Sequence, residues 1–317
     1  MAVIADTQNL SHAAVRQAQP EHLLNGHLLL ATDGTASADG AVSLAAELRR
    51  RGSAQVSVLA VYEAAPMPVP SADPSLGAMT TISGDATLRD EFFSRVDRQV
   101  ERLFEGQPPV DVRHTEGSPV RSIVAAALNG EFDLIITGLR VHSLMDRLVG
   151  DETALRVTRA TDRPVLAVSP ALTQVPRRAV VGIDFSRASM RAATTAAGML
   201  ATGGTLTLLH ARPRLDPSAI AGEGVNQPYL RGVSAALEGL RANIAALFPE
   251  ISVDIERREG EAAEAILNYA IASNADFAAV GRHRRNAIAH AVLGSVATSL
   301  LRKAKLSVLV LPPGNSD

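Results

Sequence analysis

The sequence contains one internal repeat, and this repeat limits the fold more than any other feature. The segment DLIITGLR, which begins at Asp133, aligns with DFAAVGRH, which begins 143 positions later at Asp276. The segments PVLAVSP from Pro164 and SVLVLPP from Ser307 are separated by the same 143 positions. Solenoid repeats have periods of about 20–50 residues, so this longer period indicates a duplicated domain.

The repeat predicts a tail and two domains. We expect a flexible tail over residues 1–22, a first domain over 23–171 and a second over 177–317, with the hinge near Pro170–Pro176. Near the start of each half, Asp33 in LLLATDGT corresponds to Asp184 in AVVGIDFS.

Each half alternates short apolar runs with helical patterns. In the first half, Leu88, Phe92, Val96, Val100 and Leu103 recur every three or four residues, which predicts one buried stripe on a helix. Continuous apolar runs are typical of buried parallel strands. The predicted strands are 28–32, 56–61, 110–114, 134–136 and 165–168 in the first half, and 180–183, 206–209, 251–255, 277–280 and 308–311 in the second. Strands separated by helices imply right-handed crossovers and a parallel sheet covered on both faces.

Two segments rich in turn-forming residues follow the second strand of each half. These are 63–85 and 212–227, and both are expected to be mobile loops. Ligands of open α/β sheets bind at the carboxyl ends of the strands. The same end of each half is therefore the expected ligand site.

Composition and motifs exclude several classes of protein. There is no cysteine, which removes disulfides, zinc–thiolate sites and thiol catalysis, and the net charge of −2 gives no basic field for nucleic acid or an anionic membrane. The first 22 residues lack the pattern of a signal peptide, and no run is long enough to span a membrane. These features predict a soluble cytoplasmic protein. We find no nucleophile–base arrangement or P-loop, so the chain is not expected to be an enzyme, although weak ATP hydrolysis stays open.

The order of these motifs resembles the universal stress protein family. The resemblance rests on a strand ending in Asp, a glycine before an Ala-rich helix, DLIITG and a final PVLAVSP, and it covers about residues 25–170 and 178–313. It implies two tandem, open, five-stranded parallel-sheet α/β domains with helices on both faces, Rossmann-like and similar to the adenine nucleotide alpha hydrolases. It also implies pairing of the halves through their last strands within one chain, and a homodimer of tandem chains stays open.

In ATP-binding members of this family, Gly-x2-Gly-x9-Gly-Ser/Thr follows the fourth strand. Glycines let the backbone approach phosphates, and a helix N-terminus offers N–H donors to them. The resemblance assigns an adenine nucleotide, such as ATP with Mg²⁺, to the second half. The residues it assigns are Asp184, Ala211, Gly281, Arg284, Gly294, Ser295 and Val296. Arg284 replaces the second glycine. The basic run 282–285 would either add positive charge near the phosphates or fill the site with side chains, and a solvated turn without a binding role also stays open.

The first half departs further from this pattern. Asp33, Val61 and Gly138 match, but Val141 replaces the second glycine and Asp151 falls where Gly-Ser is expected. A carboxylate close to a phosphate is unfavourable by a few kcal/mol at an effective dielectric of about 20. We therefore predict a poor triphosphate site here.

Three functional hypotheses follow. The first is a non-enzymatic stress-response protein that binds an adenine nucleotide in its second half and acts on an unknown protein partner. The second is a tandem scaffold in which both sites have decayed, and the third, a remote one, is an adenylate-handling enzyme. Asp33 and Asp184 also admit a purely structural role, because Asp often ends a strand and caps the next helix.

Overall fold

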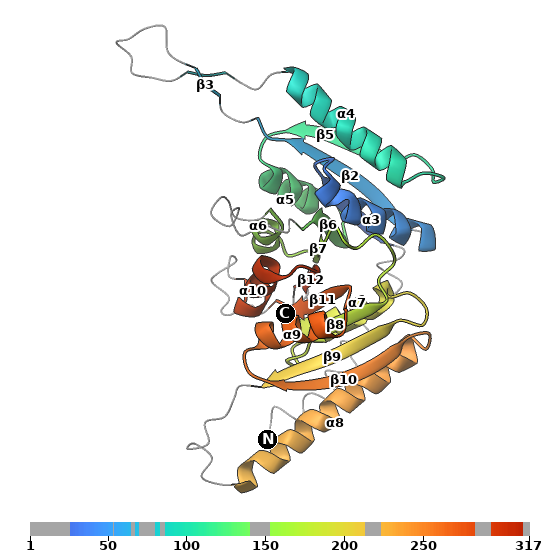
Figure 1. The fold of residues 1–317 in the computed structure, drawn as a ribbon, viewed down its shortest axis with the longest axis vertical. Coiled ribbons are helices and arrows are strands. Elements are labelled where there is room, and N and C mark those ends of the chain that lie inside the picture. Colours follow the sequence, from blue (N-terminus) through green and yellow to red (C-terminus); the bar gives the residue numbers. More distant parts are fainter. Residues whose placement is uncertain are drawn as a thin grey trace.

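Ten strands form one continuous sheet in the computed structural model (Figure 1). The structure describes residues 26–52, 54–64, 67–69, 80–82, 86–139, 153–212, 223–282 and 293–312. The strand order is β10-β9-β8-β11-β12-β7-β6-β1-β2-β5. Neighbours within each half run parallel, and the two halves meet where β7 and β12 pair antiparallel.

The first half supplies five strands of the main sheet. These are β1 (His27–Thr32), β2 (Gln55–Tyr62), β5 (Asp111–Glu116), β6 (Leu134–Gly138) and β7 (Val165–Val168). Its helices are the short 3-10 helix η1 (Ala36–Ala38), then α3 (Asp39–Arg51), α4 (Ala86–Leu103), α5 (Pro119–Asn129) and α6 (Thr153–Ala160). The second half repeats this order with β8 (Arg178–Gly182), β9 (Thr205–Arg212), β10 (Ser252–Glu259), β11 (Phe277–Gly281) and β12 (Ser307–Leu311). Its helices are α7 (Arg187–Met199), α8 (Glu223–Leu247), α9 (Ala262–Ala272) and α10 (Ser295–Lys303).

The predicted α/β class with two five-stranded parallel units is confirmed, and two loop predictions need correction. Segment 63–85 contains a separate two-stranded sheet of β3 (Met67–Val69) and β4 (Thr80–Ile82). The loop predicted over 212–227 ends earlier than expected, because α8 already begins at Glu223. The apolar stripe that marks this helix in the sequence starts only at Leu230. The domain limits stay a prediction, since the sheet is continuous across the hinge.

The two faces of the sheet are covered by equivalent helices of both halves. One core cluster joins residues of α3, α4, α7 and α8, and it includes Val42, Val96, Ala193 and Leu240. The other face carries α5, α6, α9 and α10, and one cluster there joins Leu155 of α6 with Leu300 of α10. In Figure 1, α6 and α10 lie together on the left, with α3 and α7 on the right. The two halves therefore share buried apolar surface on both faces, which stabilises their contact.

The two outer strands carry charges at most exposed positions. In β5 these are Asp111, Arg113 and Glu116, and in β10 they include Asp254 and Arg257. Helix α4 packs beside one end of the sheet and α8 beside the other (Figure 1). Among the described residues, no helix combines the length and apolar character needed to cross a membrane.

Candidate nucleotide site

A cavity of about 260 Å³ lies at the carboxyl ends of β8, β9 and β11. Six sequence-predicted residues of the second half line it: Asp184, Ala211, Gly281, Gly294, Ser295 and Val296. They meet because β8 lies between β9 and β11 in the sheet, so the ends of these three strands are neighbours. The seventh predicted residue, Arg284, lies outside the described residues.

The cavity has further walls that the sequence patterns did not single out. They are mostly apolar: Gly182, Ile183, Leu209, Ala262, Ile266, Val280, Leu293 and Ala297. Several come from the last residues of β8, β9 and β11, and others from the first two turns of α9. Position at a strand end was the available signal for Ile183, Leu209 and Val280, whereas nothing in the sequence marked Ile266 as a wall.

The first turn of α10 faces this cavity. Gly294 is the N-cap residue and makes no side-chain cap, and Ser295 is the first helical residue. The first N–H groups of a helix have no partner within it and carry partial positive charge, which suits a phosphate or another anion. No atom lies within 4 Å of the point where a Cβ on Gly294 would be built, so the approach to these N–H groups is open on the described side.

Gly281 has a structural reason to be glycine. A Cβ at this position would lie 2.4 Å from the backbone nitrogen of Ser189 and 2.5 Å from the carbonyl carbon of Ala188. Both atoms belong to the first turn of α7, which packs directly on the end of β11. The family motif assigned this glycine to phosphate binding, with a structural role in a turn as the alternative. The structure adds a requirement of the fold.

Asp184 organises the turn that leads from β8 into α7. Its Oδ1 accepts hydrogen bonds from the backbone N–H of Ser186 at 3.0 Å and from the Ser186 hydroxyl at 2.6 Å. The Ser186 hydroxyl oxygen in turn accepts from the N–H of Ser189 at 3.1 Å and so caps α7. Phe185 between them has a φ of 63°, in the left-handed region. The structural role considered for Asp184 is therefore present, and Asp184 also lines the cavity.

Arg282 does not supply charge to this cavity, which corrects the expectation for the basic run. Its guanidinium is buried and points across the boundary between the halves. It donates to the carbonyl oxygens of Thr158 at 2.8 Å and Thr161 at 2.9 Å, and it pairs with Asp162. The carbonyls at the end of α6 carry partial negative charge, which attracts a cation. The other three residues of the run, 283–285, lie outside the described residues.

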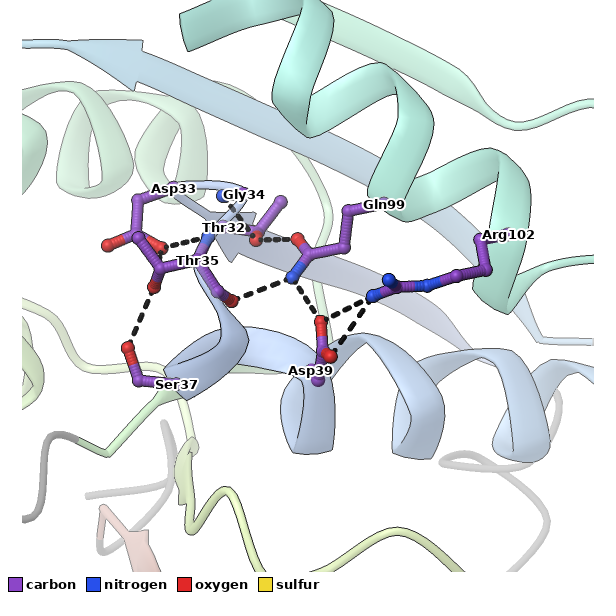
Figure 2. A network of polar contacts seen from close by, with 8 residues as sticks. All are labelled: Thr32, Asp33, Gly34, Thr35, Ser37, Asp39, Gln99 and Arg102. Atoms are coloured by element: carbon purple, nitrogen blue, oxygen red, sulfur yellow. Dashed lines mark hydrogen bonds and ion pairs between the residues drawn. The ribbon is translucent and has the colours of Figure 1, made fainter.

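The equivalent turn of the first half is held by a polar network (Figure 2). Asp33 Oδ1 accepts from the N–H and the hydroxyl of Thr35, as Asp184 does from Ser186. Beside this turn, buried Gln99 of α4 accepts from the Thr32 hydroxyl at 2.6 Å and donates to Asp39 at 2.6 Å. The second half has apolar Ile183 and Met190 in place of Thr32 and Asp39.

The other predicted residues of the first half lie nearby. Gly138 ends β6, and a Cβ there would lie 3.3 Å from Cα of Ala38. Val61, near the end of β2, is buried in an apolar cluster with Ile123. Val141 and Asp151 lie outside the described residues, so the predicted conflict with phosphate at Asp151 stays a prediction.

Thr137 is an unusual buried residue of the first half. It corresponds to Val280 of the cavity and is 3% exposed, and its hydroxyl has no hydrogen-bond partner in the described structure. Alternation along β6 places it on the same face as Ile135, which packs against α5. A buried hydroxyl without a partner costs about 1–3 kcal/mol.

We expect Thr137→Val to raise the free energy of unfolding by about 1 kcal/mol, because it removes this hydroxyl and keeps the branched shape. Urea unfolding would measure the change. Thr158→Val is the matched control, since the Thr158 hydroxyl is equally buried but donates to the carbonyl of Ala154 at 2.7 Å. A loss of stability in Thr137→Val as large as in the control would show that the Thr137 hydroxyl has a partner in solution.

Comparison with known proteins gives a family match in each half of the chain. The model of the family described as the Universal stress protein family matches residues 25–169 and 176–312. Universal stress protein Slr1230 of Synechocystis sp. (strain ATCC 27184 / PCC 6803 / Kazusa) is 27% identical over 186 residues. That alignment covers 57% of this chain and 58% of the length of the relative.

Two crystal structures have the same fold over nearly the whole chain. A universal stress protein from Archaeoglobus fulgidus DSM 4304 superposes with a TM-score of 0.60 at 20% identity, covering 92% of this chain and 97% of that one. A functionally unknown protein from Pseudomonas aeruginosa PAO1 superposes with a TM-score of 0.58 at 18% identity, covering 90% of this chain and 92% of that one.

Proposed function

Because the chain belongs to the universal stress protein family, we propose that its second half binds an adenine nucleotide such as ATP. We further propose that the chain is a non-enzymatic stress-response protein whose output is a nucleotide-dependent change in the binding of a protein partner. The observation that carries the proposal is the convergence of six sequence-predicted residues on one cavity of about 260 Å³.

The chemistry of the cavity supports this assignment. Its walls are mainly apolar, which suits a purine ring, and ligand pockets generally combine such walls with a few polar groups that fix orientation. The polar groups here are the carboxylate of Asp184 and the hydroxyl of Ser295, together with the first N–H groups of α10. A carboxylate suits ribose hydroxyls, and the helix N-terminus suits phosphates.

Mg²⁺ would enter this site bound to the nucleotide. Within the described ranges, no group of three His, Asp or Glu side chains could hold a metal ion by itself. Mg²⁺ commonly keeps several waters and binds through substrate phosphates with few protein ligands. The hydroxyl of Ser295 is the side-chain oxygen of α10 that could contribute.

The test compares two substitutions at Gly294. Gly294→Asp and Gly294→Ser both supply an N-cap side chain to α10 in open space, so both should fold and even gain stability. Only Gly294→Asp adds a negative charge where the phosphates are proposed to lie. We expect it to weaken ATP binding at least about tenfold relative to Gly294→Ser, measured by calorimetry.

A scaffold without nucleotide binding is the second candidate. It is favoured by the structural roles of Gly281 and Asp184, which explain both residues without any ligand. Saturating ligand stabilises a protein by about 2.7 kcal/mol at one hundred times the dissociation constant. No melting shift with millimolar Mg-ATP, and no nucleotide released when the purified protein is denatured, would favour the scaffold and contradict the nucleotide proposal.

A further inference from the structure

We propose that the contact between the two halves is built to accept unlike halves only, so that the first half pairs with a second half and neither pairs with its own kind. This inference does not depend on nucleotide binding. The alternative is a dimer of chains in which first half meets first half and second half meets second half. The backbone alone permits that alternative.

The pairing of β7 with β12 is symmetric. Leu166 lies opposite Leu309, which is its own counterpart 143 positions later. Ala167 lies opposite Val308, and Val165 lies opposite Val310, as a two-fold axis through the central pair requires. A copy of either half could therefore replace the other with the same strand register. Only the residue types at the contact can distinguish like from unlike halves.

The ion pair of Arg282 is the first such distinction. Arg282 contributes its buried guanidinium from the second half, and Asp162 contributes its carboxylate from the first. The counterpart of Arg282 in the first half is Leu139, and the counterpart of Asp162 in the second half is Lys305. Two second halves would thus place Arg282 against Lys305 twice. Two first halves would leave Asp162 facing Leu139.

The carbonyl oxygens that Arg282 also binds do not discriminate. They belong to Thr158 and Thr161, and the counterparts Leu301 and Ala304 have backbone carbonyls too. The sign of the charge beside them therefore decides the preference. Like charges placed together at an interface suppress the wrong partner more than they change the strength of the right one.

A second contact distinguishes the halves independently. The backbone N–H of Ser169 donates to the hydroxyl of Ser307 at 3.0 Å, and both residues are buried. The counterpart of Ser169 is Pro312, which has no N–H, and the counterpart of Ser307 is Pro164, which has no hydroxyl. Neither kind of like pairing can make this bond.

The experiment exchanges the two discriminating charges in the full chain. The double variant Asp162→Lys with Lys305→Asp keeps composition and net charge. When unlike halves pair, the lysine introduced at position 162 lies beside Arg282. When two second halves pair, the aspartate introduced at position 305 lies beside Arg282. We expect its dimer dissociation constant to fall at least about tenfold below that of the wild type in sedimentation equilibrium. The matched control is Arg241→Glu with Glu238→Arg, which exchanges an exposed ion pair on α8.

A cross-link identifies which halves meet. Since the chain has no cysteine, Leu309→Cys provides a single thiol beside the two-fold axis. It faces its own copy only when two second halves pair. We expect an interchain disulfide in the charge-exchanged background and none in the wild-type background.

The outcomes are decisive in either direction. Equal dimerisation or equal cross-linking in the two backgrounds overturns the proposal. If the double variant does not fold, Lys305→Asp alone replaces it, because this exposed substitution leaves the pair of Arg282 with Asp162 intact. It should still increase the cross-linked fraction, and an unchanged fraction overturns the proposal as well.

Discussion

Replacing Gly281 with alanine is expected to lower the free energy of unfolding by about 3 kcal/mol. The added Cβ would lie 2.4 Å and 2.5 Å from two backbone atoms of the first turn of α7. Backbone cannot rotate aside as a flexible side chain can, so β11 and α7 must separate or shift. Overpacking of this kind costs about 1–3 kcal/mol and occasionally more. Urea unfolding followed by circular dichroism would measure the loss.

Gly239→Ala is the matched control for this prediction. Gly239 is exposed on α8, and no atom lies within 4 Å of the point where its Cβ would lie. Alanine in a helix interior is more favourable than glycine by about 0.5–1 kcal/mol, so this variant should gain stability. If Gly281→Ala lost no more than a few tenths of a kcal/mol, the close packing of α7 on β11 would be wrong, and phosphate binding would be left as the reason for this glycine.

Removing the side chain of Arg282 is expected to lower the free energy of unfolding by about 3 kcal/mol. Arg282→Ala deprives two carbonyl oxygens at the end of α6 of a charged donor, and it leaves Asp162 without this partner. Hydrogen bonds to charged groups contribute about 1.5–3 kcal/mol each. The Asp162 side chain is 51% exposed, so water compensates part of its loss.

One further variant separates the effect of the positive charge at position 282 from that of the planar guanidinium group, and another serves as a control. Arg282→Lys should fall between the wild type and Arg282→Ala, because an ammonium group cannot reproduce the planar guanidinium fork. Arg241→Ala removes an exposed arginine paired with Glu238 and should change stability by less than about 0.5 kcal/mol. An Arg282→Ala variant as stable as Arg241→Ala would contradict the buried contact between the halves.

Much of the fold could be predicted from the sequence, because its two strongest signals are local. Apolar runs such as 134–136 and 277–280 fall inside β6 and β11, and the duplication implied that both halves have the same order. The meeting of Asp184, Gly281 and Ser295 could also be expected. Their strands are neighbours in a parallel sheet, and α10 follows β11 along the chain.

What could not be predicted depends on contacts across the sheet. Arg282 follows Gly281 directly, and its place in the chain suggested the phosphates, but its partner Asp162 is 120 positions away in the other half. Sequence spacing does not show on which side of a strand end a long side chain lies. The left-handed turn at Phe185 was not predicted for a different reason, because phenylalanine seldom adopts a positive φ, although the first half has the left-handed Gly34 at the equivalent position.

The charged outer strands restrict how a protein partner can be recognised. A common mode of recognition adds a peptide as one more strand to an exposed sheet edge. Strand β5 presents Asp111, Arg113 and Glu116 at such an edge, and β10 presents Asp254 and Arg257 at the other. Charges of both signs on an edge oppose the addition of an apolar strand and the open-ended stacking that leads to aggregates. We therefore expect a partner of this chain to bind surfaces other than these two edges, and we expect the ten-stranded sheet to resist growth by the addition of further strands.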